Sequence, residues 1–352
     1  MQEQITVLQP PISKNRIQWI DILKIIGMFE IYLFHNLSPD SPPRSFFFVF
    51  FVEMFFLMSG FFSDRKKEES FLSFVWKKFK AIMIPYFSFA VLCEFVLLFN
   101  NEYNLHQLLA DGKHYLFGIR TTLPAQTLWF LPCLFLISVI YRALLTVLRN
   151  KYIVFAAAFV ISWLFPYSNP SWFWNLDSAL KYLVFYALGH LAYSWIMNCR
   201  FKKLKLKGKL IYVAFVLAAL CYAVFAYIDN IYFPFTFFNI QLPPTILNVY
   251  KMFAAVIIIF LHIQLALLLE NIQILSRFGK YTLIFCGTET ISNLLVTGFL
   301  SVFGVTVYLT SPLSAALFSV ICMAFSWFVF VPLFDRYLPW ALGKWKHTEN
   351  KK

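Results

Sequence analysis

The sequence LSAALFSVICMAFSWFVFVPLF, residues Leu313–Phe334, contains no charged side chain. A helix of about twenty apolar residues spans the roughly 30 Å hydrocarbon core of a bilayer. Similar uncharged runs occur at Leu210–Tyr227 and Tyr152–Trp163. The chain of 352 residues is 60% hydrophobic and 13% charged, whereas soluble domains are about a quarter charged. The sequence therefore predicts an all-α protein that crosses a membrane many times.

The apolar runs predict a bundle of about ten transmembrane helices. Their approximate bounds are 17–37, 45–62, 79–99, 127–148, 152–168, 179–198, 210–228, 246–269, 281–300 and 312–334. Ten crossings place 23 Lys and Arg on one side, whereas the loops of the other side hold only Arg44, Lys113 and Arg120. Because positively charged loops remain in the cytoplasm, we expect both termini there. The predicted parts are an N-terminal tail (1–16), a transmembrane domain (17–334) and a basic C-terminal tail (335–352).

The composition also bears on partners and cofactors. The net charge of +13 and the 44 Phe, 18 Tyr and 10 Trp are typical of helices and loops that contact lipid, so we expect membrane lipid and no nucleic acid as a partner. The basic loop Arg200–Lys209 has two interpretations, an orientation signal against anionic lipid or a site for an anionic ligand. The six Cys show no CxxC spacing, and neither a disulfide nor a metal is predicted.

The first predicted helix, RIQWIDILKIIGMFEIYLFHN (Arg16–Asn36), carries ionisable side chains inside an apolar segment. Each costs about 2.5–3.5 kcal/mol to insert, so each requires a partner or a function. Asp21 and Lys24 are three residues apart and are expected to pair. His35 lies ~21 Å further along the axis than Asp21. It is either an interfacial hydrogen-bonding residue or a general base, because a neutral imidazole accepts a proton.

Asp21, Lys24 and His35 have a spacing that resembles the first-helix signature of the acyltransferase-3 family. Five further segments are similar to later motifs of this family in the expected order: FFVEMFFLMSGFF (Phe50–Phe62), WKKFKAIMIPYF (Trp76–Phe87), LWFLPCLF (Leu128–Phe135), FYALGHL (Phe185–Leu191) and GKYTLIF (Gly279–Phe285). The resemblance implies a multi-spanning enzyme that uses acyl-CoA to modify surface sugars.

The sequence departs from the family pattern at two places. The family usually has Arg-x-x-Arg ahead of Pro-Tyr, where this chain has Lys78 and Ala81, flanked by Lys77 and Lys80. The resemblance implies that these three lysines bind the phosphates of the donor, although positive-inside charge explains them equally well. Many members have a His where this chain has Glu289, which is a candidate to orient a partner, bind sugar hydroxyls or form a polar pair.

The expected activity is O-acyl transfer, with acetyl from acetyl-CoA as donor substrate and a hydroxyl of a cell-surface or lipid-linked glycan as acceptor, in the plasma (inner) membrane. The candidate catalytic residues are His35, Glu289 and Glu53, and the candidate structural or orienting residues are Asp21, Lys24 and Glu30. The alternative is a flippase or exporter of a lipid-linked polysaccharide, because intramembrane carboxylates and histidines also line transport paths. The lack of an internal repeat favours the enzyme.

Overall fold

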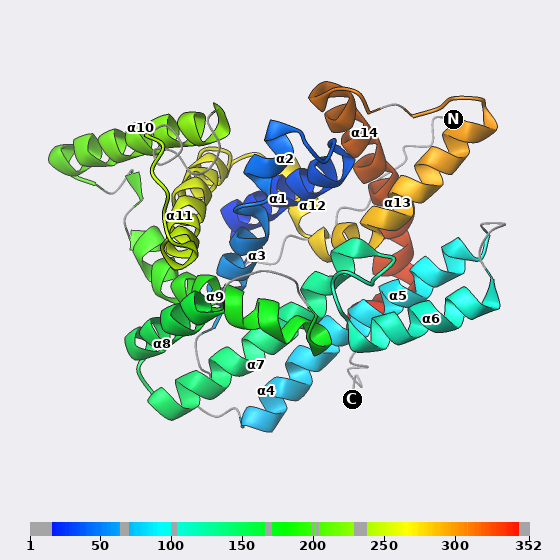
Figure 1. The fold of residues 1–352 in the computed structure, drawn as a ribbon, viewed down its shortest axis with the longest axis horizontal. Helices are drawn as coiled ribbons and strands as arrows, with labels where there is room; N and C mark the ends of the chain where they lie inside the picture. Colours follow the sequence, from blue (N-terminus) through cyan, green and yellow to red (C-terminus); the bar gives the residue numbers. More distant parts are fainter. Residues whose placement is uncertain are drawn as a thin grey trace, which may run out of the picture.

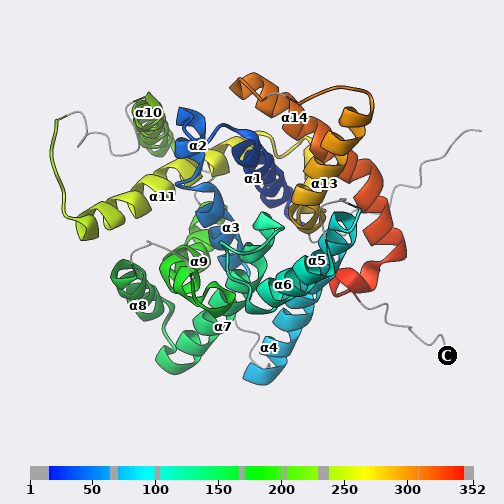
Figure 2. The same ribbon diagram turned by 45° about the vertical axis from the view of Figure 1, so that its right-hand side comes forward.

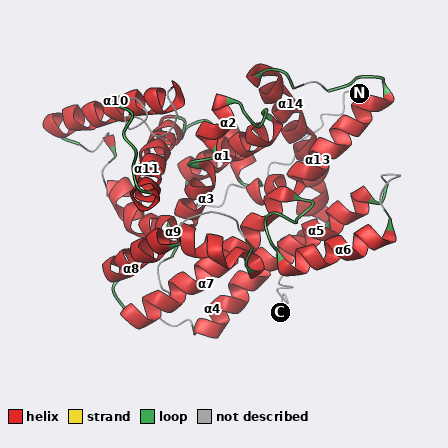
Figure 3. Ribbon diagram, in the orientation of Figure 1, coloured by secondary structure: helices red, strands yellow, loops and turns green. Residues whose placement is uncertain are grey.

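The computed structural model describes residues 16–63, 70–99, 104–165, 171–198, 200–201, 204–228, 238–307 and 309–344. Within these ranges every regular element is a helix and there is no strand, as Figure 3 shows. Each of the ten predicted segments contains a helix. Most of the two predicted tails, residues 1–15 and 345–352, lies outside the described residues.

The helices follow one another along the chain as labelled in Figure 1. They are α1 (Gln18–Asn36), α2 (Pro42–Phe47), α3 (Phe51–Gly60), α4 (Phe71–Lys78), η1 (Phe79–Met83), α5 (Ile84–Leu97), α6 (Leu105–Phe117), η2 (Gln126–Trp129), α7 (Phe130–Leu148), α8 (Lys151–Leu164), η3 (Phe173–Asn175), α9 (Leu176–Asn198), α10 (Leu206–Ile228), α11 (Pro244–Leu268), α12 (Gln273–Gly279), α13 (Thr282–Val302), α14 (Pro312–Phe325), η5 (Ser326–Phe330), η6 (Leu333–Tyr337) and η7 (Pro339–Leu342). The π-helical turns η1 and η5 continue α4 into α5 and extend α14.

Seven helical segments of the described chain are long and apolar enough to cross a membrane. They are Pro42–Gly60, Phe71–Leu97, Gln126–Leu148, Leu206–Ile228, Pro244–Leu268, Thr282–Val302 and Pro312–Tyr337. Of the other predicted spans, α8 has only 14 residues, α1 carries three charged residues and polar residues lower the hydropathy of α9. The protein is therefore a multi-pass membrane protein, while ten crossings and cytoplasmic termini stay predictions.

Two separate helices, α6 and α12, lie outside the predicted spans, and α4 precedes the span predicted at 79–99. Helix α6 begins at a capping box formed by Asn104 and Gln107. Helix α6 contains the polar residues Asp111, Lys113 and His114. The sequence therefore shows no continuous apolar run at this place. Helix α6 lies beside α5 in both ribbon views (Figures 1 and 2).

Helix α3 packs against α1 and α9 near the centre of the bundle (Figure 2). Two motif glycines allow the α3–α9 contact. A Cβ on Gly60 would lie 2.0 Å from the carbonyl oxygen of Tyr186, and a Cβ on Gly189 would lie 2.0 Å from that of Leu57. Small residues let helix backbones approach closely in membranes, where lipid tails remove the hydrophobic force between helices. By contrast, α10 lies at the edge of the molecule (Figure 1), contacts α11 and α2, and is mostly exposed.

Candidate active site

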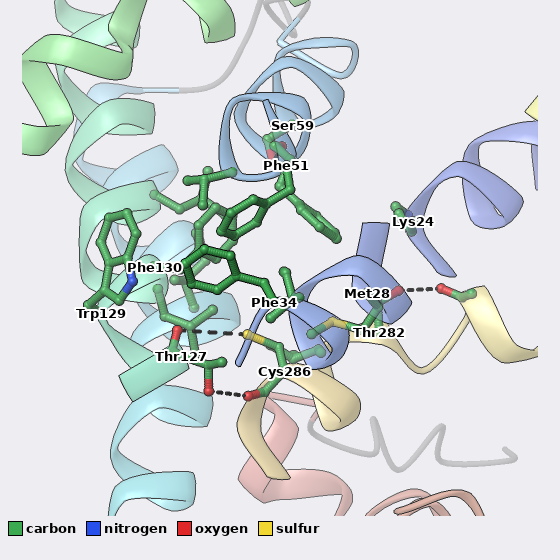
Figure 4. A pocket seen from close by; sticks show the side chains of 18 of the residues that line it. Lys24, Met28, Phe34, Phe51, Ser59, Thr127, Trp129, Phe130, Thr282 and Cys286 are labelled. Atoms are coloured by element: carbon green, nitrogen blue, oxygen red, sulfur yellow. Dashed lines mark hydrogen bonds between the residues drawn. The ribbon is translucent and has the colours of Figure 1, made fainter. Parts of the chain in front are cut away.

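One face of α1 lines a cavity inside the bundle. Lys24, Met28, Ile31 and His35 lie three or four residues apart, which places them on one side of a helix, and all four line a cavity of about 320 Å³. The other walls come from α3, η1, α7 and α13. In Figure 4, Phe51 and Ser59 enter it from α3, and Phe130 and Trp129 from the start of α7.

The cavity has two ends that are lined by different polar groups. Lys24 and Lys280 line one end, near the start of α1, and His35 lies near the end of α1. Eleven helical residues separate Lys24 from His35, a distance of about 16 Å along the axis. We call these the Lys24 end and the His35 end. The cavity thus connects two basic side chains at one level of the bundle with an imidazole at another.

His35 pairs with Glu289 of α13. Its Nδ1 lies 3.1 Å from Oε1 of Glu289, whose side chain is only 2% exposed. The amide of Asn293 donates to the same oxygen at 2.7 Å, and the hydroxyl of Thr290 donates to Oε2 at 3.0 Å. Because a carboxylate accepts hydrogen bonds, this ion-pair contact favours the tautomer with the proton on Nδ1. Nε2 then carries the lone pair and makes no hydrogen bond with any described residue. An imidazole arranged in this way can accept a proton at Nε2.

Hydrogen bonds to the α13 backbone hold Glu289 at this place. The hydroxyl of Tyr32 on α1 donates to the carbonyl oxygen of Phe285 at 3.0 Å, and that of Thr127 donates to the carbonyl oxygen of Cys286 at 2.8 Å (Figure 4). Both acceptors lie within one turn of Glu289. The position of the carboxylate is therefore fixed from α1 and from η2.

The other two candidate carboxylates do not contact His35. Glu30 is bonded to His262 of α11, with 2.7 Å between its Oε1 and Nε2 of the imidazole. Glu53 is buried on α3, where its carboxylate interacts electrostatically with Lys181 and Arg120. Neither lines the cavity. Of the three predicted partners of the imidazole, the structure brings Glu289 alone to His35.

Asp21 forms the predicted pair with Lys24, at 3.3 Å, and also binds Arg16 at 2.7 Å. Its backbone touches α12 because Gly279 has no side chain. A Cβ at Gly279 would lie 1.8 Å from the carbonyl oxygen of Asp21. Gly279 therefore lets α12 pack closely against the start of α1. The next residue, Lys280, lines the Lys24 end of the cavity.

The predicted donor-binding lysines lie beside the cavity and do not line it. The amino group of Lys78 lies over the ring of Phe74 and that of Lys80 over the ring of Trp76, each 5.7 Å from the ring centre. Of the same segment, Ala81 and Ile82 reach the cavity. The assignment of Lys77, Lys78 and Lys80 to donor phosphates stays a prediction.

Lys280 belongs to a polar chain at the Lys24 end. Its amino group donates to the hydroxyl of Tyr281 at 3.2 Å, and Tyr281 donates to Asp335 at 2.9 Å. Lys344 lies 3.5 Å from the same carboxylate. These groups join the segment before α13 to η6 and to the segment after η7.

Three residues of the site have no role in the sequence-based predictions: Arg120, Lys280 and Asn293. Arg120 was one of three basic residues on the side with few charges, and that isolation is a usable signal. Lys280 lies within a motif, and Asn293 follows Glu289 by one helical turn. No cluster of three His, Cys, Asp or Glu suited to a metal occurs within the described ranges.

Comparison with known proteins identifies the family. The family model named acyltransferase domain, of the acyltransferase-3 type, matches residues 17–331. No curated protein and no solved structure matches the chain. The matched region contains α1, the cavity and the His35–Glu289 pair. The chain therefore belongs to the acyltransferase-3 family and is a multi-pass membrane protein with an acyltransferase domain.

Proposed function

We propose that the protein transfers an acyl group, most simply acetyl, from acyl-CoA to a hydroxyl of a cell-surface or lipid-linked glycan. The observation that carries the proposal is the oriented imidazole in the cavity. Nδ1 of His35 is held by the Glu289 carboxylate at 3.1 Å, while the ring lines the cavity that extends to Lys24 and Lys280.

The transfer follows from this geometry as general base catalysis. Nε2 of His35 removes the proton of the acceptor hydroxyl while the oxygen attacks the thioester carbonyl carbon, forming the new C–O bond. The imidazolium is stabilised by Glu289 through Nδ1. Collapse of the tetrahedral intermediate breaks the C–S bond, and the proton on Nε2 passes to the CoA sulfur. The products are the acyl ester and CoA, and His35 returns to its neutral form.

The two ends of the cavity suit the two substrates. Basic side chains at the Lys24 end, together with the neighbouring Lys77, Lys78 and Lys80, suit the phosphates of CoA. An acyl chain on a flexible arm then reaches along the ~16 Å of apolar wall towards His35. The acceptor enters at the His35 end. In this arrangement neither substrate crosses the path of the other.

The test uses purified protein in lipid nanodiscs with labelled acetyl-CoA and surface glycans of the host organism. Label should appear in the glycan with the wild-type protein and be absent with His35→Gln. An enzyme-free preparation and a heat-inactivated sample are the controls. If lipid-linked glycan crosses the bilayer of proteoliposomes and no acceptor gains label, the proposal is wrong and the protein is a flippase.

A further inference from the structure

The His35 end of the cavity also contains a guanidinium group. Arg120 lines the cavity, and its Cζ lies 4.2 Å from the centre of the Trp129 ring and 5.9 Å from that of Phe48. Phe48 stacks on Phe34 at 6.0 Å, and Phe34 meets the imidazole of His35 edge-on at 5.4 Å. This chain of ring contacts places Arg120 at the same end as the proposed base.

The segment that carries Arg120 is fixed by the backbone before α9. The N–H of Arg120 donates to the side-chain oxygen of Asn175 at 2.8 Å, and the amide nitrogen of Asn175 donates to the carbonyl oxygen of Gly118. The indole of Trp174 donates to the carbonyl oxygen of Leu116 at 3.0 Å. Trp174 and Asn175 have φ of 52° and 56°, a strained conformation that persists when the surroundings determine it. The backbone at Arg120 is therefore held in place by these hydrogen bonds.

Several charged side chains lie near this segment. Glu53 interacts electrostatically with both Lys181 and Arg120. Lys181 in turn interacts with Lys251 and Arg120, which carry like charge. The carboxylate of Asp177 accepts hydrogen bonds from backbone N–H groups of its own segment. Two cations, Lys181 and Arg120, thus interact with the buried Glu53 carboxylate, and of the two Arg120 lines the cavity, where a guanidinium attracts an anion.

We propose that the acceptor is acidic, and that Arg120 binds its carboxylate or phosphate group. A guanidinium offers paired N–H donors that match both anions. Trp129 and Phe34 line the cavity and form an apolar wall for a sugar ring, next to the base that activates its hydroxyl. The inference rests on the proposed function, because it takes the occupant of the His35 end to be the acceptor.

Binding of small probes tests this subsite without turnover. Titration calorimetry on the protein in nanodiscs compares methyl glucuronide, glucose 1-phosphate and methyl glucoside. At least one acidic probe should bind about 10- to 100-fold more tightly than the glucoside, the range for a hydrogen bond to a charged group. Arg120→Gln should remove this preference, and Arg120→Lys should retain part of it. Arg44→Gln is the matched control, because Arg44 lies over Phe34 at 4.7 Å and donates to Leu37 without lining the cavity.

The source of the anion is decided by acetyl-CoA titration of the same variants. Unchanged acetyl-CoA affinity in Arg120→Gln supports an acidic acceptor, whereas a large loss assigns Arg120 to donor phosphate and overturns the inference. Equal binding of all three probes, or a preference that survives in both Arg120 variants, overturns it as well. If acidic probes bind through Arg120 while no label is ever transferred, the proposed function fails and the anion subsite stands.

Discussion

Helix α1 carries two histidine–carboxylate pairs with opposite surroundings. At its end, His35 contacts Glu289 at 3.1 Å and faces the cavity. In its middle, Glu30 contacts His262 at 2.7 Å on the side of α11, away from the residues that line the cavity. Both nitrogens of His262 are engaged, since Nδ1 lies 2.8 Å from the carbonyl oxygen of Ile258. In His35 the contact with Glu289 uses only Nδ1.

The difference shows that a buried histidine–carboxylate pair is insufficient evidence for catalysis. A base needs one nitrogen that is oriented and a second that can reach a substrate. His35 meets both conditions, whereas His262 joins α1 to α11 and is covered by the ring of Phe50, with 4.7 Å between ring centres. We interpret the second pair as a structural link between helices.

The largest effect is expected when the two histidines are replaced in parallel. His35→Gln should reduce turnover by about 10²–10⁴-fold, the usual contribution of a positioned base, and leave acetyl-CoA affinity unchanged. His262→Gln should lower the melting temperature and keep kcat near the wild-type value. Label transfer and thermal unfolding on the same preparations check both. Equal loss of kcat in two folded variants would remove the distinction between the pairs.

Replacing the two carboxylates, Glu289 and Glu30, tests the same difference and should change kcat less than replacing His35. Glu289→Gln should lower kcat by about 10- to 100-fold, because a hydrogen bond to a charged group contributes ~1.5–3 kcal/mol, with little change in KM for either substrate. Glu30→Gln serves as the control and should affect stability more than kcat. A Glu289→Gln enzyme with wild-type kcat would show that the imidazole is oriented by another group.

A further comparison is between lysines beside the cavity and a lysine that lines it. Replacing Lys77, Lys78 and Lys80 together with Gln should weaken acetyl-CoA binding by about 10-fold, since partly exposed ion pairs contribute up to ~1 kcal/mol each. Added salt should weaken wild-type binding in the same direction. Lys280→Gln, at the cavity itself, is the matched single change. Unchanged affinity in the triple variant would leave those three lysines as orientation signals.

The smallest effect is expected when the hydrogen bond from Asn293 to Glu289 is removed. Asn293→Ala removes the 2.7 Å bond to the oxygen that holds His35. It should reduce kcat by about 2- to 10-fold, because a typical net hydrogen bond contributes ~0.5–1.5 kcal/mol. Thr290→Val, which affects the other oxygen, is the control and should cost less. A loss as large as that of Glu289→Gln would assign Asn293 a direct contact with the reacting groups.

Part of the site follows from helix periodicity. At about 100° per residue, Lys24, Met28, Ile31 and His35 share a face, whereas Glu30, five residues before His35, lies about 140° away from it. This period indicates the lining stripe and accounts for the contact of Glu30 with His262 on another side of α1, although Glu30 was predicted as an orienting residue. Hydropathy likewise predicts each long apolar helix. A helix that crosses the bilayer needs about twenty mainly apolar residues, and such a run is visible in the sequence.

Hydropathy fails where a helix lies outside the apolar runs. Helix α6, with Asp111, Lys113 and His114, is stabilised by its capping box and by packing on α5, where Tyr86 donates to the carbonyl oxygen of Tyr115 at 2.6 Å. Such a helix has no twenty-residue apolar signal. Its existence depends on tertiary contacts.

The sequence by itself determined a helical membrane protein, the family motifs and His35 as a candidate base. Only the tertiary structure decided that Glu289 contacts this imidazole and that Arg120 lines the same cavity. The physical reason is that His35, Glu289 and Arg120 lie on segments far apart in the sequence. Their positions depend on backbone approaches such as Gly60 with Gly189 and Gly279 with Asp21, and packing of this kind leaves no periodic pattern in the chain.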